Sequence, residues 1–169
     1  MTNPLDAIRV DVNPVISPDQ LYSFYQQNNI CEAGYSKEVC ARTLQHSSLI
    51  VAAFDGDCLV GLARALFDGV DAYIAELSLA LAYQGGGTRY RNGSLVEADP
   101  TGLGQKMGQT LIDAVQEMGA YFISADVVPD CEQAFYRALG FEDSGSVAYC
   151  IDRRPYVVRE EPVDRGDAS

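Results

Sequence analysis

Two glycines stand at the start of a stretch that has the apolar periodicity of a helix. Gly102 and Gly104 lie in the sequence TGLGQKM, and Leu103, Met107 and Leu111 then recur at helical spacing. The first amide groups of a helix have no partner within it, and glycine lets a ligand approach the backbone closely. The pattern therefore indicates a phosphate-binding helix start, although two glycines also suit a tight turn that binds nothing.

A single carboxylate lies in a long apolar stretch. Glu76 is the one acidic residue within residues 72–83. On a strand, its side chain would share a face with Ser78 and other small or apolar residues, and such surroundings would raise the pKa of the carboxyl. A raised pKa suits a general base that works near neutral pH. Asp126, in a later predicted strand, is a second candidate base, and the structural alternative for Glu76 is pairing with an arginine.

Strand and helix signals alternate through the chain without a domain boundary. A capping box at Ser17 predicts a first helix that ends at Asn28, and Ser36 predicts the cap of a second helix that runs to His46. Further helices are predicted at residues 103–118 and 130–139, and strands at residues 8–12, 49–54, 59–66, 72–83, 121–128 and 146–152. This order predicts one α/β or α+β domain in residues 1–158, with a mixed sheet and helices on its faces. Residues 159–169 are charged and contain Pro and Gly, which predicts a flexible acidic tail.

The charge balance argues against several classes of function. The 169 residues include 12 Lys and Arg against 24 Asp and Glu, so the formal net charge is −12. Nucleic-acid binding needs clustered basic residues, whereas this balance is compatible with a cationic small-molecule substrate. No apolar run approaches the roughly 20 residues of a membrane span, and the N-terminus lacks a secretory signal pattern. We therefore expect a cytoplasmic protein that binds neither nucleic acid nor membrane.

The cysteines do not have the spacing of a metal site. Their number is odd, no pair forms a CxxC motif, and His46 is the single histidine of the chain. We expect reduced, mostly buried thiols and no metal. The five cysteines are Cys31, Cys40, Cys58, Cys131 and Cys150.

Three stretches, taken in order, resemble the GNAT superfamily of N-acetyltransferases. They are AYIAELSLALAYQGGG (72–87), TGLGQKMGQTLI (101–112) and AFYRALGF (134–141). The hairpin sequence at 50–69 resembles the second and third strands of the family, and the ending YCIDRRPYV also occurs in some bacterial members. The resemblance covers roughly residues 8–158. It implies a mostly antiparallel sheet of six to seven strands with helices on both faces, and acetyl-CoA as co-substrate.

The phosphate-binding loop of the family is interrupted in this chain. Family members usually join a Gln/Arg-x-x-Gly-x-Gly/Ala motif within a few residues, but here residues 88–101 separate the glycines after Gln84 from Gly102. Either the loop starts at Gln84 and carries an insertion, which we favour, or Asp99 stands at the Gln/Arg position, where its charge would repel a pyrophosphate. Arg89 and Arg91 lie in the insertion and either contact phosphates or are ordinary solvated charges.

The resemblance also implies roles for individual residues in acetyl transfer to a primary amine by direct attack. An alkylammonium group has a pKa of about 10.4, so its proton must leave before attack, and Glu76 is the candidate base. Tyr136 would protonate the departing thiolate, and a backbone amide near Leu79 or Leu81 would stabilise the oxyanion at a bulge. The implied cofactor-binding residues are Leu79, Ala80, Leu81, Gln84, Gly87, Arg89, Gly102, Leu103, Gly104, Gln105 and Lys106.

The acceptor and the catalytic competence stay open at the level of sequence. Phe24, Tyr25 and Tyr35 would wall an acceptor pocket, or pack in the core. The interrupted loop supports an alternative, a catalytically inactive GNAT-fold binding or regulatory module. Transfer of another acyl group, such as succinyl, is a third reading. The acceptor would be an amine of a small molecule or peptide, and a homodimer is common in the family.

Overall fold

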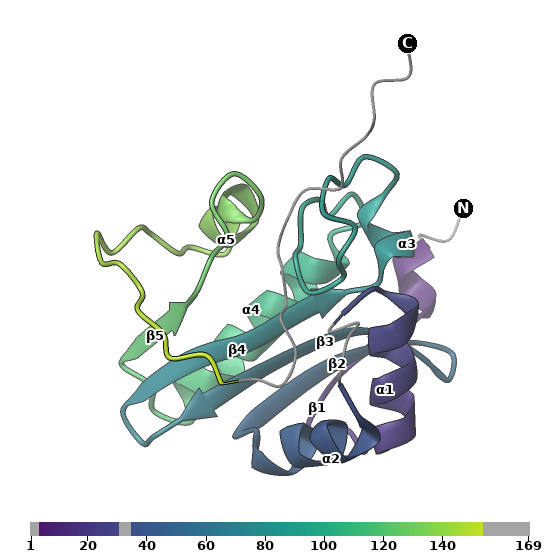
Figure 1. Ribbon diagram of the computed structural model, residues 1–169, viewed down its shortest axis with the longest axis horizontal. Coiled ribbons are helices and arrows are strands. Elements are labelled where there is room, and N and C mark those ends of the chain that lie inside the picture. The colour runs from purple at the N-terminus through teal and green to yellow at the C-terminus, as the bar shows by residue number, and fades with distance from the viewer. Residues whose placement is uncertain (1–3, 31–34, 154–169) are drawn as a thin grey trace.

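The computed structural model describes residues 4–30 and 35–153, and these residues form a five-stranded sheet with helices on both faces (Figure 1). The predictions for Cys31 and for the tail at 159–169 lie outside the described residues. The elements are the 3-10 helix η1 (Pro4–Ala7), β1 (Ile8–Val12), α1 (Pro18–Gln27), α2 (Lys37–His46), β2 (Leu49–Asp55), β3 (Cys58–Phe67), β4 (Asp71–Leu79), α3 (Leu81–Gln84), α4 (Leu103–Glu117), β5 (Phe122–Ala125) and α5 (Gln133–Ala138).

The strands lie in the order β1-β2-β3-β4-β5, which follows the chain. The first four are antiparallel neighbours, and β5 is parallel to β4. Residues 71–74 of β4 pair with residues 122–125 of β5, and the pairing stops there, although β4 continues to Leu79. The carboxyl half of β4 therefore has one edge that β5 does not cover.

The helix starts follow the capping chemistry that the sequence predicts. The Ser17 hydroxyl accepts a hydrogen bond from the Gln20 amide, and the Gln20 side chain accepts one from the Ser17 amide. Ser36 caps α2 in the same way through the amide of Val39. Both predicted helices are thus confirmed, with ends at Gln27 and His46.

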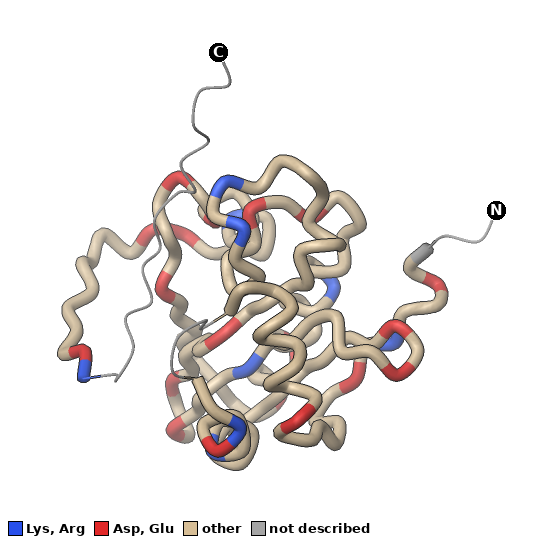
Figure 2. The backbone as a smooth tube through the Cα atoms, turned by 45° about the vertical axis from the view of Figure 1, so that its right-hand side comes forward, with Lys and Arg blue, Asp and Glu red and all other residues tan. Residues whose placement is uncertain are grey.

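Two helical layers enclose the sheet. Helices α1 and α2 pack together on one face, and α4 crosses the other face over β2, β3 and β4 (Figure 1). Gly61 of β3 permits this close approach, because a Cβ there would lie 2.4 Å from the Met107 sulfur of α4. Acidic residues are spread along much of the described chain (Figure 2).

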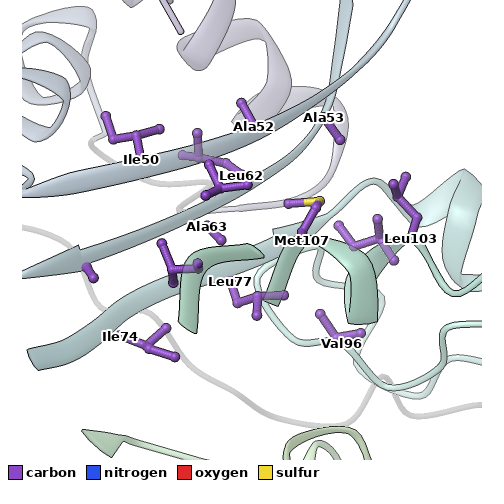
Figure 3. Close-up of a cluster of buried hydrophobic side chains, with 14 of the residues drawn as sticks. Ile50, Ala52, Ala53, Leu62, Ala63, Ile74, Leu77, Val96, Leu103 and Met107 are labelled. Atoms are coloured by element: carbon purple, nitrogen blue, oxygen red, sulfur yellow. The ribbon is translucent and has the colours of Figure 1, made fainter. Parts of the chain in front are cut away.

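Buried apolar residues on both faces of the sheet form the core. On the α4 side, Leu103 and Met107 of α4 lie with Leu77 of β4 and Val96 of the long connection between α3 and α4 (Figure 3). Val96 is fully buried, although it belongs to a segment without regular structure. The connection after α3 is therefore part of the core and not only a surface loop.

Four predicted elements differ from the structure. The strand expected at residues 146–152 is absent, so the sheet has five strands and not six or seven. Val147, Tyr149 and Ile151 alternate as in a strand, but Tyr149 is 94% exposed, and a lone strand without a partner edge is not stable. The strand expected at 72–83 ends at Leu79, because residues 81–84 turn into α3. The strand at 121–128 and the helix at 130–139 are each shorter than predicted.

Within the described residues, no helix is long and apolar enough to cross a membrane. Nor does the described part of the chain bring together three or more His, Cys, Asp or Glu side chains in an arrangement that could hold a metal ion.

Candidate active site

Glu76 is the centre of a buried polar cluster on the α1 face of the sheet. Its Oε2 accepts hydrogen bonds from the Tyr25 hydroxyl at 2.6 Å and from Arg64 Nε at 2.7 Å. Its Oε1 accepts one from the Ser78 hydroxyl at 2.7 Å. Three donors thus fix the carboxylate, while Oε1 retains one acceptor position, because a carboxylate oxygen can accept about two hydrogen bonds.

The β3–β4 register places the two charged members of this cluster side by side. Arg64 lies directly opposite Glu76, and the register shifts between Arg64 and Ala65, which marks a bulge. The bulge expected near Leu79 therefore lies near Glu76 instead. Arg64 and Glu76 form an ion pair whose side chains are 19% and 8% exposed, so little solvent screens it.

Burial and the Glu76 charge shift the ionisation of the groups around it. Burial alone would lower the pKa of Arg64, but the charge and hydrogen bond of Glu76 raise it overall. Burial, followed by the Glu76 charge, raises the pKa of Tyr25 well above its usual value. The same two causes raise the pKa of the buried Cys40 thiol to about 11. At neutral pH the Tyr25 phenol and the Cys40 thiol are therefore protonated.

The three predicted acceptor-pocket aromatics take different positions. The Tyr25 and Tyr35 rings meet edge to face with centroids 5.1 Å apart, and the Tyr25 hydroxyl reaches Glu76. Phe24 is 2% exposed within the core. The structure thus brings Tyr25 and Tyr35 to the Glu76 cluster, whereas Phe24 serves packing.

Tyr136 lies on α5 in an aromatic environment. Its ring contacts Phe135 and Phe141 edge to face, with centroids 5.5 Å apart in each pair. Burial, then the charge of Glu132, raises the pKa of the Tyr136 phenol far above its usual range, and Tyr73 of β4 is close enough to contribute. Among the described residues, the Tyr136 hydroxyl makes no hydrogen bond. The phenol therefore keeps its proton at neutral pH and can donate it.

Asp126, the second candidate base, follows β5 and is exposed. Its carboxylate accepts a hydrogen bond from the Tyr73 hydroxyl at 3.1 Å. Burial, followed by that hydrogen bond, raises the pKa of Tyr73. Asp126 is thus part of a second polar group on the exposed side of the β4–β5 pair.

The backbone amides expected to face the acyl group already have acceptors. The amide of Leu79 donates to the Gly93 carbonyl at 2.8 Å, and that of Ala80 donates to the Val60 carbonyl of β3. The amide of Leu81 donates to the Asn28 side chain at 2.9 Å. The described conformation therefore leaves none of these three amides free to stabilise an oxyanion.

Gln84, the predicted start of the phosphate loop, is buried and bonded within the chain. Its side-chain nitrogen donates to the Leu79 carbonyl at 3.0 Å, and its oxygen accepts from the Glu97 amide at 3.1 Å. Gly87 is exposed beyond it. Gln84 thus anchors the connection between α3 and α4 in this conformation.

The start of α4 holds a carboxylate of its own chain. Asp99 Oδ1 accepts from the Gly104 amide at 3.1 Å, and Oδ2 accepts from the Gln105 amide at 2.8 Å. The Leu103 amide donates to the Thr101 hydroxyl at 3.3 Å. Gly102 is left-handed, with φ of 76°, and shapes the turn into the helix. The amides predicted to cradle a phosphate therefore bind Asp99 and Thr101.

The basic residues predicted to contact phosphates are all exposed. Arg89 is exposed and stacks on the Tyr90 ring, 5.7 Å from its centroid. Arg91 is exposed and left-handed, with φ of 49°. Lys106 is exposed, and the Gln105 side chain donates to the Phe135 carbonyl at 3.0 Å. Among the described residues, no ion pair joins these cations to Asp99.

Several residues of the site were missed in the sequence. Arg64 could have been found as a candidate partner, because it is the one charged residue of β3, the strand that precedes β4 in the hairpin. Asn28, Gly93 and Glu132 gave no such signal, because they lie outside the helices and strands, in segments whose path the sequence does not define.

The described conformation does not fit acyl-CoA at the positions that the resemblance implied. A pyrophosphate needs free amides at a helix start, and those of α4 are taken by a negatively charged side chain. An acyl carbonyl needs a free strand amide, and that of Leu79 is bonded to Gly93.

Comparisons with solved structures identify the fold. A GNAT-family acetyltransferase from Streptococcus pneumoniae is 22% identical, with 87% of this chain and 99% of that chain covered and a TM-score of 0.61. A putative acetyltransferase from Deinococcus radiodurans is 22% identical, with coverage of 90% and 92% and a TM-score of 0.64. The acetyltransferase AAC(6')-Iy, bound to a bisubstrate analogue of CoA and acetylneamine, is 12% identical, with coverage of 87% and 99% and a TM-score of 0.62.

No protein-family model and no curated protein sequence matches the chain. The structural likenesses show that the chain has the fold of GNAT acetyltransferases, which confirms the predicted fold class.

Proposed function

We propose that this chain is an N-acetyltransferase that moves an acetyl group from acetyl-CoA to a primary amine of a small molecule or peptide. The observation that carries the proposal is the buried Glu76 carboxylate, with one open acceptor position on Oε1, within a GNAT fold. A similar fold in AAC(6')-Iy binds CoA and an aminoglycoside-derived group in one analogue, which supports a small cationic amine as acceptor.

Two residues of the chain would carry the two proton transfers. Acetyl-CoA supplies an activated acetyl carbonyl. Glu76 Oε1 accepts the proton that the attacking amine loses, either directly or through a water molecule. Tyr136 donates its phenolic proton to the sulfur as the carbon–sulfur bond breaks, and its raised pKa keeps that proton in place until then. Arg64 and Tyr25 hold the carboxylate in position.

The test is turnover of an amine panel with acetyl-CoA, followed as acetylated product by mass spectrometry, in the native protein and in Glu76→Gln. Without the base, the amine must lose its proton in solution, so the pH–rate profile of the variant should move to higher pH, toward the amine pKa of about 10.4. Tyr25→Phe is the comparison variant: it removes one donor to Glu76 but keeps the carboxylate, so its pH–rate profile should move less than that of Glu76→Gln. A profile of Glu76→Gln identical to that of the native protein would remove Glu76 as the base.

Glu76→Gln leaves the buried Arg64 guanidinium without its counter-charge, so thermal unfolding must confirm that the variant is folded.

A second candidate function is a catalytically inactive GNAT-fold module. The contacts of Asp99 and Gly93 favour it, because they occupy the amides that a donor would use. Such a module would acetylate no amine of the panel.

A further inference from the structure

We infer that the connection between α3 and α4, residues 85–101, is an internal occupant of the acyl-CoA position and competes with that ligand. We call these residues the occupying segment. The inference rests on the proposed use of acyl-CoA, and three independent contacts of the segment carry it.

The first contact is at the start of α4. Asp99 bonds the amides of Gly104 and Gln105, the second and third residues of the helix, through both of its carboxylate oxygens. These are the amides that a phosphate would use, and the partial positive charge of the helix start favours either anion. The Asp99 carboxylate thus accepts the hydrogen bonds that phosphate oxygens would accept. Its negative charge would also repel a phosphate bound beside it.

The second contact is at the uncovered edge of β4. Leu79 presents both its amide and its carbonyl away from β3, because the neighbouring Ala80 amide donates to β3. The Gly93 carbonyl accepts the Leu79 amide at 2.8 Å, and the Gln84 side chain donates to the Leu79 carbonyl at 3.0 Å. Gly93 has no space for a side chain, since a Cβ would lie 2.8 Å from Asn28 and 3.1 Å from the Leu79 oxygen. At Gly93 the segment therefore occupies the uncovered edge of β4, where the extended arm of a ligand would pair.

The third contact lies between these two, where β5 no longer pairs with β4. Val96 is fully buried beside Leu77, Leu103 and Met107 (Figure 3). The Val96 amide donates to Glu132 Oε1 at 3.2 Å, and Glu132 Oε2 accepts from the Val128 amide at 3.2 Å. The buried Glu132 thus ties the segment to the chain that leaves β5. Together the three contacts fill the region from the β4 edge to the start of α4.

A ligand with a pyrophosphate must displace Asp99 before it can bind the amides of α4. The free energy of that displacement subtracts from the affinity for acyl-CoA, because the competing carboxylate is attached to the same chain. Removal of the Asp99 charge should therefore raise the affinity for CoA.

The experiment is calorimetric titration of CoA into the full-length native protein, Asp99→Ala, Asp99→Asn and Asp113→Ala. Asp99→Asn keeps the shape of the side chain and one acceptor, so it guards against a folding defect in Asp99→Ala. Asp113→Ala is the matched control: it removes one exposed carboxylate from the same helix, about 15 Å from the helix start. We expect both Asp99 variants to bind CoA at least about ten-fold more tightly than the native protein and the control.

Equal or weaker binding of CoA by folded Asp99 variants would overturn the inference, and so would the absence of detectable binding in every variant. The readout is binding, so it separates the inference from the proposed function. A gain of CoA affinity without acetylation of any amine would support the occupying segment and reject the acetyltransferase. If the native protein binds CoA tightly and acetylates an amine, and Asp99→Ala binds CoA more weakly, the acetyltransferase would be supported and the occupying segment rejected.

Discussion

The surroundings of Tyr136 are aromatic and those of Glu76 are polar, and each environment suits a different proton transfer. Glu76 has three donors, one of them a guanidinium, which orient its carboxylate. Tyr136 has aromatic neighbours, a raised pKa and no hydrogen bond to its hydroxyl among the described residues. A charged acceptor and a neutral donor are what removal of a proton from an amine and delivery of a proton to sulfur require.

Replacement of Tyr136 by Phe tests the donor. If the phenol protonates the departing thiolate, Tyr136→Phe should lower kcat about ten-fold or more, with little change in the affinity for acetyl-CoA, because a single hydroxyl is lost from a packed ring. Steady-state kinetics with calorimetric binding separates the two quantities. Tyr121→Phe, at a tyrosine that is 91% exposed, is the matched control. An unchanged kcat in Tyr136→Phe would contradict the role of the phenol.

Cys40 makes the stability of the fold depend on alkaline pH. Its pKa in the folded protein is about 11, against a usual value of 9.0, so the unfolded chain loses the thiol proton first as pH rises. The associated stability is complete below about pH 9 and is lost progressively as pH rises toward 11, for a total of about 2–3 kcal/mol.

Comparison with Cys40→Ala isolates this effect, because the variant retains every other titrating group. Urea unfolding at pH 8 and at pH 11 should show that the stability difference between the native protein and Cys40→Ala shrinks by about 2 kcal/mol at the higher pH. A difference that does not change with pH would show that the thiol titrates normally in the folded state.

At the scale of elements, α4 begins where the occupying segment ends, and one carboxylate stabilises both. Asp99 acts on the helix as a capping residue does, although the residue at the cap position is Gly102. Asp99→Ala should therefore lower the free energy of unfolding by about 1–2 kcal/mol, whereas Asp113→Ala should change it by less than about 0.5 kcal/mol. Urea unfolding measures both, and equal effects would show that Asp99 does not cap α4.

The sequence predicted the elements whose signals are local. The capping box of α1, the serine cap of α2, the turn at 56–57 and the apolar periodicity of α4 each depend on a few neighbouring residues, and these predictions are confirmed. The prediction of a strand at 146–152 was wrong for the converse reason. Alternation of apolar residues gives a strand only if the edge of another strand is available to pair with it.

The candidate site was predictable where it lies on paired strands. Glu76 was predictable as the one carboxylate of an apolar strand, and Tyr25 from the apolar face of α1, whereas the pairing of Glu76 with Arg64 depends on a bulge in the β3–β4 register. The contacts of the occupying segment were not predictable, because Asp99 and Gly93 come to α4 and β4 through a connection without periodicity. The sequence pointed to a conflict at Asp99 but could not show that its carboxylate turns inward onto the helix.

At the scale of the whole molecule, the net charge of −12 should affect which acceptors reach the site quickly. Acidic residues occur along much of the described chain (Figure 2), so a cationic amine is attracted by many charges rather than by one pair. Such long-range attraction is screened by salt, because the Debye length falls from about 10 Å at 0.1 M to about 3 Å at 1 M. For an amine that carries a positive charge at neutral pH, kcat/KM should therefore fall about three-fold or more between these two salt concentrations. An aromatic amine, which is uncharged at neutral pH, provides the matched comparison with the same protein. Equal salt dependence for the two acceptors would show that the acidic surface serves solubility and does not guide the substrate.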